Sequence, residues 1–191
     1  MTTPYFRLLR VCVTGPESTG KTTLAARIAR RFDSEWVPEA SRAYAERKAA
    51  PLTADDVTPI AREHVRVADE RARSAKLLLS LDTDLLSTVI YSRHYYGRTP
   101  PWIVAAERVR RSHLYLLCDV DVPWLPDGVR DRPANREEMF ATFEGALKRR
   151  RLPYVLVRGS WALRDRIADD AVDELVSRAR PAAGRARDSR P

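Results

Sequence analysis

The segment "LRVCVTGPESTGKTTLA" (residues 9–25) passes from an apolar run through a glycine-bounded turn into a stretch that begins with a lysine. An apolar run of this length is typical of a buried strand, and it predicts one over residues 8–14. After the turn, Leu24, Ile28 and Phe32 recur four residues apart, which predicts a helix over residues 20–32 with one apolar face. A strand followed by a glycine turn and a helix is the first unit of an α/β fold.

The turn itself matches the pattern G-x-x-x-x-G-K-[ST]. Glycines let the backbone wrap around a phosphate group, while amide N–H groups and the positive end of the helix dipole face its negative charge. Lys21 is expected to reach the β- and γ-phosphates of a nucleotide, and the hydroxyl of Thr22 to bind Mg²⁺. The sequence therefore predicts a site for ATP and Mg²⁺ formed by Gly15, Pro16, Glu17, Ser18, Thr19, Gly20, Lys21, Thr22 and Thr23.

Apolar runs and amphipathic stretches alternate along the rest of the chain. Further strands are predicted around residues 34–37, 76–84, 113–121 and 153–159, with helices between them. This alternation is typical of the P-loop NTPase fold, a doubly wound parallel sheet with helices on both faces.

Two of the expected helices carry clear signals. Thr53 followed by Asp56 forms a capping-box pattern ahead of a long helix with a stripe of small residues. The final helix is expected to bury Leu163, Ile167, Ala171 and Leu175, which recur at four-residue spacing.

Length and composition limit the class of protein. A chain of 191 residues with 44% hydrophobic content can bury one sizeable core, so we expect one domain over residues 1–179. No stretch approaches the roughly 20 apolar residues of a membrane helix, and no secretory signal is recognisable, so a cytoplasmic protein is expected. Cys12 and Cys118 each lie within a predicted strand, which is typical of buried core residues.

The net charge of +8 is concentrated partly in the tail, where residues 180–191 hold four arginines and one aspartate. The tail has little apolar content, so we expect it to be disordered. A basic protein can bind nucleic acid or act on anionic small molecules. The chain lacks a basic stripe interleaved with aromatic residues, which favours the small molecule over nucleic acid.

A magnesium ligand is expected at the end of the run "LLLSLD". Asp82 should emerge beside the phosphate-binding turn, because strand ends meet at one edge of a doubly wound sheet. Asp84 points the same way if the chain is still extended there. The alternative for either aspartate is a helix N-cap after the strand.

The segment "VPWLPDGVRDRPANREE" (residues 122–138) is rich in proline, glycine and charge, and it leads into a helix expected to bury Phe140, Phe143 and Leu147. We interpret it as a lid whose arginines, Arg130, Arg132 and Arg136, neutralise the charge of a transferring phosphoryl group. The alternative is a solvated charged loop.

An acceptor site is predicted after the second strand, where "EWVPEASRAY" combines aromatic and charged residues. Glu39 could accept a proton from a hydroxyl, Arg42 lies one helical turn further on, and Trp36 offers a flat surface for a ring. Tyr96, with its neighbours His94 and Tyr95, is expected near the same mouth. A core position is the alternative for these aromatic residues.

Three classes of nucleotide-binding protein were compared with these features. A GTP-binding switch would show an N-K-x-D stretch, which is absent from the sequence. An AAA-type motor needs a further helical lid domain, for which too few residues follow the last strand. A small-molecule kinase fits best; a regulatory or nucleic-acid-associated ATPase remains the alternative from another class.

Several separated segments together resemble the nicotinamide riboside kinase domain of NadR-type proteins, a P-loop kinase grouped with small AAA-like ATP-binding domains. They are "GPESTGKTTLA", "WVPEASRAY", "LDTDLLSTVIYSRHYYG", "VPWLPDGVRD" and "LPYVLVRGSWALR". The resemblance implies ATP-dependent phosphorylation of the 5′-hydroxyl of nicotinamide riboside to nicotinamide mononucleotide, a step of NAD biosynthesis. A kinase of another nucleoside or of a vitamin-like alcohol is the alternative within this class.

The resemblance also implies roles for particular residues. Lys21 and Thr22 would serve phosphate and Mg²⁺, Asp82 and Asp84 the metal and the acceptor, Glu39 and Arg42 the acceptor side, Arg130 the lid, and Trp161 the adenine-side loop. The implied partner is a nucleoside-like small molecule. Because the sequence begins directly at the kinase strand, adenylyl transfer by an N-terminal nucleotidyltransferase domain is not expected.

Overall fold

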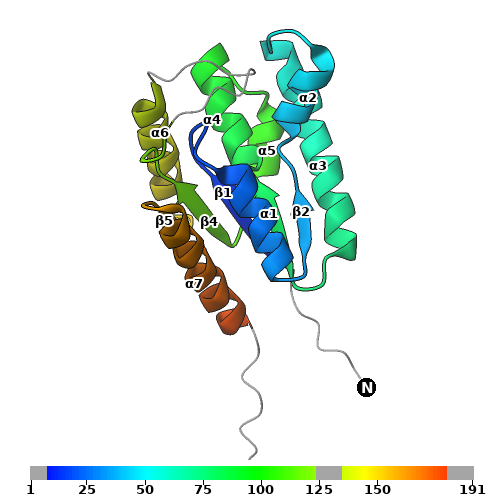
Figure 1. The fold of residues 1–191 in the computed structure, drawn as a ribbon. Coiled ribbons are helices and arrows are strands. Elements are labelled where there is room, and N and C mark those ends of the chain that lie inside the picture. Colours follow the sequence, from blue (N-terminus) through cyan, green and yellow to red (C-terminus); the bar gives the residue numbers. More distant parts are fainter. Residues whose placement is uncertain (1–7, 124–134, 180–191) are drawn as a thin grey trace, which may run out of the picture.

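The computed structural model describes residues 8–123 and 135–179 (Figure 1). Two of the predicted lid arginines, Arg130 and Arg132, and the tail of residues 180–191 lie outside these ranges. Within them the chain forms one sheet covered by helices on both faces, which confirms the predicted α/β fold.

The sheet has five strands in the order β2-β3-β1-β4-β5, and every neighbouring pair is parallel. Because the strands run in parallel, the residues that follow their carboxyl ends meet at one edge of the sheet. The strands are β1 (Leu9–Thr14), β2 (Glu35–Val37), β3 (Leu78–Asp82), β4 (Leu114–Cys118) and β5 (Tyr154–Val157).

The helices form two layers, one on each face of the sheet. Residues of α1 and α7 pack on one face together with Val11 and Val13, whereas residues of α3, α4 and α6 pack on the other together with Cys12 and Tyr115 (Figure 1). The helices are α1 (Lys21–Arg31), α2 (Ala40–Lys48), α3 (Val57–Ser74), α4 (Leu85–Tyr96), α5 (Pro101–Val109), α6 (Arg136–Arg149) and α7 (Trp161–Ala179).

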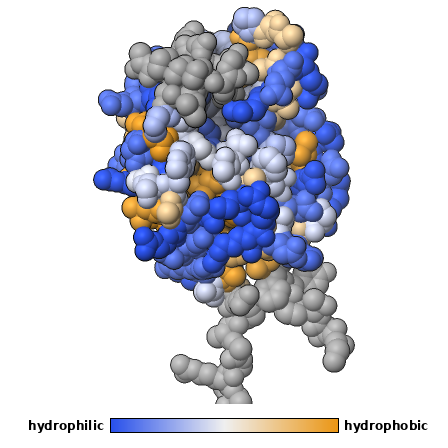
Figure 2. Space-filling model, viewed as in Figure 1, coloured by the Kyte–Doolittle hydropathy of each residue, from blue (hydrophilic) through white to orange (hydrophobic). Residues whose placement is uncertain are grey.

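The outer surface of the α1 and α7 layer is mainly hydrophilic, with apolar residues showing between the charged ones (Figure 2). Arg27 of α1 pairs with Asp165 at 2.8 Å, and Arg31 pairs with Asp173 of α7 at 2.7 Å. These ion pairs join the two helices on their solvent side, while their apolar sides cover the sheet.

The capping box ahead of α3 is confirmed. The backbone N–H of Thr53 donates to the Asp56 carboxylate at 2.7 Å, and the Thr53 side chain accepts from the backbone N–H of Asp56. The first turn is a 3₁₀ helix over Ala54–Asp56, so α3 itself begins at Val57.

The buried stripe of α7 lies one residue away from the predicted one. Leu163 is 38% exposed, and Ile167, Ala171 and Leu175 are only partly buried. The buried positions are Arg164, Ala168, Val172 and Val176. The sequence supports both stripes because both have four-residue spacing, and the packing against β1 and β5 selects the one that contains an arginine.

The remaining helices, α4, α5 and α6, were predicted to different extents. The helices α4 and α5 were not predicted individually; the "YSRHYYGRTPPW" stretch (residues 91–102) contains the end of α4 and the start of α5. In α6, Phe143 and Leu147 are buried and Phe140 is partly buried. Among the described residues, no helix is both long and apolar enough to cross a membrane.

Candidate functional site

The turn between β1 and α1 can be built only with glycine at both ends. Gly15 has φ 132° and Gly20 has φ 79°, a region that other residues rarely adopt. A Cβ at Gly15 would lie 2.7 Å from the Cys118 carbonyl oxygen, and a Cβ at Gly20 would lie 2.7 Å from the Trp161 ring. The backbone of the turn is therefore packed directly against the end of β4 and the start of α7.

Lys21 is the first residue of α1, directly after this turn, and is only 6% exposed. Its Nζ donates to the Pro16 carbonyl at 2.7 Å, and the Thr19 hydroxyl donates to the same carbonyl at 2.8 Å. The turn encloses a cleft of about 550 Å³, open solvent at its mouth included, lined by residues 17–23 with Glu39 and Arg42. This cleft brings the predicted phosphate-binding residues 17–23 together with two predicted acceptor-side residues, whereas Gly15 and Pro16 do not line it.

The pair Thr22 and Asp82 fits a magnesium site. The Thr22 hydroxyl donates to Oδ2 of Asp82 at 2.6 Å, and Asp82 is fully buried at the end of β3. Its other oxygen, Oδ1, is buried and has no hydrogen-bond partner within the described residues. A hydroxyl and a carboxylate oxygen are hard oxygen ligands of the kind that Mg²⁺ uses alongside nucleotide phosphates.

Burial raises the pKa of Asp82 to about 6, and the nearby Glu39 carboxylate raises it further. The hydrogen bond from Thr22 lowers the pKa but does not outweigh these two effects. Lys21 and Arg42 are close enough to act on the same carboxyl group. Two carboxylates and two cations therefore converge on the edge of the sheet beside the cleft.

The expectation that Asp84 points the same way as Asp82 is wrong. Thr83 has φ 67°, so the extended alternation of β3 stops there and Asp84 becomes the N-cap of α4. The Asp84 carboxylate accepts from the Leu86 N–H and from the Tyr115 hydroxyl, both at 2.9 Å, on the other face of the sheet. The N-cap alternative from the sequence describes Asp84 correctly.

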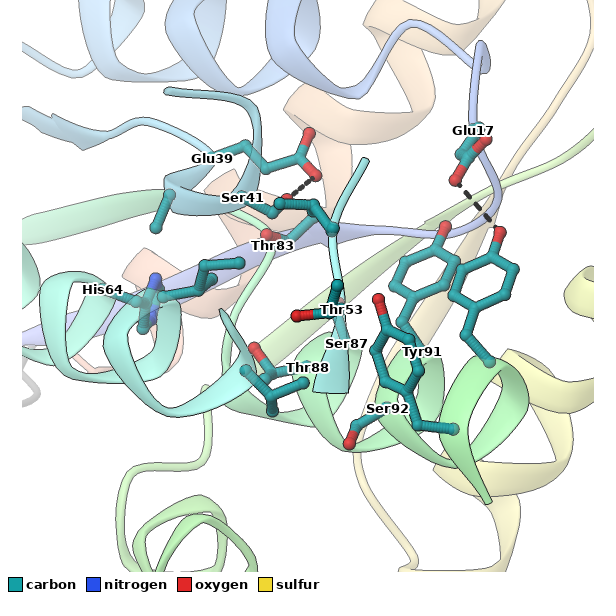
Figure 3. Close-up of a pocket in the computed structure, with 16 residues that line it drawn as sticks. Glu17, Glu39, Ser41, Thr53, His64, Thr83, Ser87, Thr88, Tyr91 and Ser92 are labelled. Carbon is teal, nitrogen blue, oxygen red and sulfur yellow. Dashed lines mark hydrogen bonds between the residues drawn. The ribbon is translucent and has the colours of Figure 1, made fainter. Parts of the chain in front are cut away.

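A second pocket adjoins the cleft and encloses about 680 Å³, open solvent at its mouth included. Glu17 and Glu39 line both the cleft and this pocket, so the two spaces share one boundary. Figure 3 shows Glu17 and Glu39 on one side of the pocket and His64 and Tyr91 on opposite flanks. The apolar lining comes from Leu52, Val57, Ile60, Tyr91, Tyr95 and Tyr96.

Glu39 is held at the boundary by the start of α2. It is the N-cap residue of this helix, is 8% exposed, and accepts a hydrogen bond from the Ser41 hydroxyl at 2.6 Å. Arg42 lies in the first turn of the same helix and faces the cleft. Tyr96 lines the second pocket as predicted, whereas Trp36 does not.

Trp36 is part of the core instead of a platform for a ring. In β2 it pairs with Ser80, and its side chain packs against the apolar cluster beneath α1 and α7. The strand alternation places Trp36 on the face opposite Val37, which packs in the cluster on the other face of the sheet.

Of the predicted lid arginines, Arg136 lies within the described residues. Its guanidinium donates to the Ser18 carbonyl of the turn at 3.2 Å and to the Val122 carbonyl at 3.1 Å. Trp161 is 58% exposed beside Gly20, which places its ring next to the phosphate-binding turn.

Two buried polar residues near the site, Arg164 and His64, were not predicted from the sequence. Arg164 is 2% exposed and donates to the carbonyls of Thr19, Asp119 and Gly159 and to the Asp121 carboxylate. His64 of α3 lines the second pocket and is 6% exposed. Each lies on the apolar stripe of its helix, which is the signal that could have identified it.

Known proteins resemble this chain in sequence. The trifunctional NAD biosynthesis/regulator protein NadR of Escherichia coli (strain K12) is 30% identical over 131 residues, which cover 66% of this chain. The same match covers 32% of the relative, so the chain spans about a third of the length of this curated relative.

Solved structures resemble it in fold. A NadR protein in complex with NR has a TM-score of 0.75 and 24% identity, and covers 88% of this chain and 52% of that one. A NadR protein in complex with NAD and AMP-PNP has a TM-score of 0.77 and 23% identity, and covers 93% of this chain and 51% of that one. The resemblance found in the sequence motifs thus extends to the whole sheet.

A family profile described as an AAA domain matches residues 10–164, which include the phosphate-binding turn and all five strands except the first residue of β1. This chain therefore belongs to the AAA-domain family of P-loop proteins.

Proposed function

We propose that the protein is an ATP-dependent kinase that phosphorylates the 5′-hydroxyl of a nucleoside, with nicotinamide riboside as the acceptor. The observation that carries the proposal is the boundary shared by the two spaces, where Glu17 and Glu39 line both. A nucleoside in the second pocket would have its hydroxyl at Glu39, next to the end of a triphosphate bound along residues 17–23. The NadR relative and the NadR protein solved with NR support this choice of acceptor.

Glu39 is the proposed general base. Its carboxylate would accept the hydroxyl proton as the acceptor oxygen forms a bond to the γ-phosphorus and the bond from phosphorus to the β,γ-bridging oxygen breaks, leaving ADP. Asp82 is the weaker candidate, because a carboxylate that binds a divalent cation becomes more acidic.

The charge of the transferring phosphoryl group would be stabilised by cations around the cleft. Lys21 and Arg42 lie in its wall, and Arg136 contacts the turn. The sequence-based assignment of Arg130 and Arg132 to the same charge stabilisation stays a prediction, because both lie outside the described residues. Mg²⁺ held by Thr22 and Asp82 would neutralise phosphate charge when bound.

The test is an ADP-release assay with ATP and Mg²⁺, run with nicotinamide riboside, with other nucleosides, with DNA, and with no acceptor. Stimulation by nicotinamide riboside, with one phosphoryl group added to the product by mass, supports the proposal. Stimulation by another nucleoside would instead identify a different acceptor, and stimulation by DNA alone would indicate a nucleic-acid-associated ATPase.

Two variants test the assigned roles. Lys21→Ala is expected to abolish turnover without unfolding the protein, whereas Lys76→Ala, which removes an exposed lysine paired with Asp33, should leave the rate unchanged. Glu39→Gln is expected to lower kcat by about 10²- to 10⁴-fold with little change in the KM for ATP. Normal turnover by Lys21→Ala would refute the phosphate-binding role of the turn.

A further inference from the structure

The phosphate-binding turn contains one residue that is left-handed but is not glycine. Ser18 has φ 54°, a conformation that glycine adopts readily and serine rarely. A residue stays in such a conformation only where its surroundings hold it there. The contacts made by the backbone of Ser18 therefore decide whether the turn keeps this shape.

Arg136, the first residue of α6, contacts that backbone. One terminal nitrogen of its guanidinium donates to the Ser18 carbonyl at 3.2 Å, and the other donates to the Val122 carbonyl at 3.1 Å. Its Nε is buried and has no hydrogen-bond partner within the described residues. Arg136 does not line the cleft; it lines a separate small cavity between the turn, α4 and α6. The guanidinium is thus enclosed against the turn and does not extend into the space for the nucleotide.

Arg164 holds the next peptide unit of the turn in the same way. Its guanidinium donates to the Thr19 carbonyl at 3.1 Å, and it too is absent from the lining of the cleft. In a planar trans peptide unit the carbonyl and the N–H point in opposite directions. Because the arginines hold the carbonyls of Ser18 and Thr19, the N–H groups of Thr19 and Gly20 point the other way. Two consecutive donors are thereby directed to the cleft that these residues line, where a phosphate group would accept from them.

The two guanidinium groups lie near each other. Burial lowers the pKa of Arg136, and the positive charge of Arg164 lowers it further. Both groups remain charged, because arginine is not deprotonated in proteins. Two cations on one side of the turn favour the orientation of the peptide units, since the carbonyl oxygen is the negative end of the peptide dipole.

We propose that Arg136 is a positioning residue that holds Ser18 in its left-handed conformation and so keeps the N–H of Thr19 directed at the nucleotide phosphates. The sequence-based lid interpretation assigns Arg136 to the phosphoryl group itself, whereas this role acts through the turn. The inference rests on nucleotide binding by the turn, which is part of the proposed function, but not on the identity of the acceptor. When the Ser18 carbonyl is released, only a fraction of the molecules keeps a competent turn, and the apparent affinity for the nucleotide falls by that fraction.

The experiment measures the Kd of AMP-PNP with Mg²⁺ by isothermal titration calorimetry. Arg136→Ala is introduced into three proteins, which carry serine, alanine or glycine at position 18. With serine it is expected to raise Kd by about 5- to 30-fold, the population cost of one strained residue. With Ser18→Gly it should raise Kd by about 3-fold or less, because glycine needs no support for a positive φ.

Ser18→Ala is the matched control for the loss of the serine hydroxyl. Alanine keeps the Cβ and with it the strain, so Arg136→Ala should raise Kd as much as it does with serine. Arg149→Ala, which removes an exposed arginine near the other end of α6, should leave Kd unchanged. Thermal melts should show that every variant is folded at the temperature of the titration.

Two results would overturn the inference. A direct contact between Arg136 and a phosphate would raise Kd by the same factor in all three backgrounds, because that contact does not depend on the residue at position 18. An unchanged Kd for Arg136→Ala with serine in place would show that the contact with Ser18 is structural only.

The proposed function fails in a different way. Binding of AMP-PNP needs no acceptor, so a kinase that acts on another nucleoside would leave these expectations intact. A wild-type protein that does not bind AMP-PNP would refute the turn as a nucleotide site, and with it both the proposed function and the role of Arg136. If the wild-type protein binds AMP-PNP and only the background dependence is missing, the role of Arg136 alone is refuted.

Discussion

Replacing Arg164 by alanine should destabilise the protein by about 3 kcal/mol. The guanidinium of Arg164 connects three segments that end at the same edge of the sheet. It donates to the Thr19 carbonyl of the phosphate-binding turn at 3.1 Å and to the Asp119 carbonyl after β4 at 2.8 Å. It also contacts the Asp121 carboxylate and the Gly159 carbonyl after β5.

The magnitude follows from what the substitution leaves behind. Removing one partner of a buried ion pair costs about 3 to 5 kcal/mol, because the other charge and its hydrogen-bonding groups stay buried. Arg164 is almost fully buried, but the Asp121 side chain is 33% exposed and water can solvate it once the guanidinium is gone. We therefore expect the lower end of this range.

Urea denaturation followed by tryptophan fluorescence measures the effect on the whole chain. Arg31→Ala is the control on the same pair of helices, since its ion pair with Asp173 lies between side chains that are 36% and 51% exposed. Such a surface pair contributes about 1 kcal/mol or less. The Arg164 substitution should also lower Tm by about 6–12 °C, which corresponds to about 3 kcal/mol for a chain of this size. It should raise the KM for ATP as well, because Arg164 holds the Thr19 carbonyl of the phosphate-binding turn.

If the two variants lose the same free energy of unfolding, the guanidinium does not hold these three segments together and the argument fails. A loss of stability with an unchanged KM for ATP would show that Arg164 stabilises the fold but does not contribute to ATP binding. The variant Arg164→Lys keeps the charge but not the planar fork, and it should fall between alanine and the wild-type protein.

Three more predictions concern the turn, the core and the start of α3. Gly20→Ala should lower the free energy of unfolding by about 1–3 kcal/mol because of its positive φ, and adding Trp161→Ala should restore part of it by removing the 2.7 Å contact. Phe143→Ala should cost about 3–5 kcal/mol in urea denaturation, since the ring is fully buried. The pKa of Asp56 is lowered to about 2, chiefly by the hydrogen bond from Lys48, so its contribution to stability is present above about pH 4 and lost as pH falls toward 2. A pH titration of the urea midpoint should show this loss in the wild-type protein and not in Asp56→Asn.

The parts of the structure that depend on local sequence could be predicted. The order of strand, glycine turn and helix over residues 9–25 predicts its own backbone, because glycine adopts the two positive φ values without the strain that a side chain would bring, and the lysine follows directly. Asp82 was also predictable, since it ends an apolar run and the parallel sheet brings such ends to one edge.

The predictions that were wrong all concern which face of a strand or helix a residue occupies. The direction of Asp84 is decided by the single φ of Thr83, and threonine gives no signal for a left-handed conformation. Trp36 sits in a strand of only three residues, too short for an alternation that would identify its face. In α7 two stripes of equal spacing compete, and one is selected by packing against β5, the preceding strand, and against β1, which lies far away along the chain.

Arg164 and His64 are buried polar residues, and their burial was equally hard to predict from the sequence. An arginine or a histidine inside a helical pattern is normally assigned to solvent, because charged and polar residues are seldom buried without partners. The partners of Arg164 in the turn lie 145 residues earlier, and no local pattern announces them. What the sequence does contain is the position of each residue on an apolar stripe, so a polar residue in such a stripe should be considered as part of a site.

Asp82, the last residue of β3, and the two residues that follow it connect the phosphate cleft to the second pocket. Asp82 accepts a hydrogen bond from Thr22, which lines the cleft. The N–H of Thr83 donates to the Val13 carbonyl of β1 at 3.0 Å, and Thr83 lines the pocket. Asp84 then begins α4, the helix that carries Tyr91, and is tied to β4 through Tyr115. Because each of these residues is bonded to an element of the central sheet, the distance between the two spaces is set by the most buried part of the fold. In-line transfer needs that distance to be constant, since a misplacement of about 1 Å can cost about 100-fold in rate.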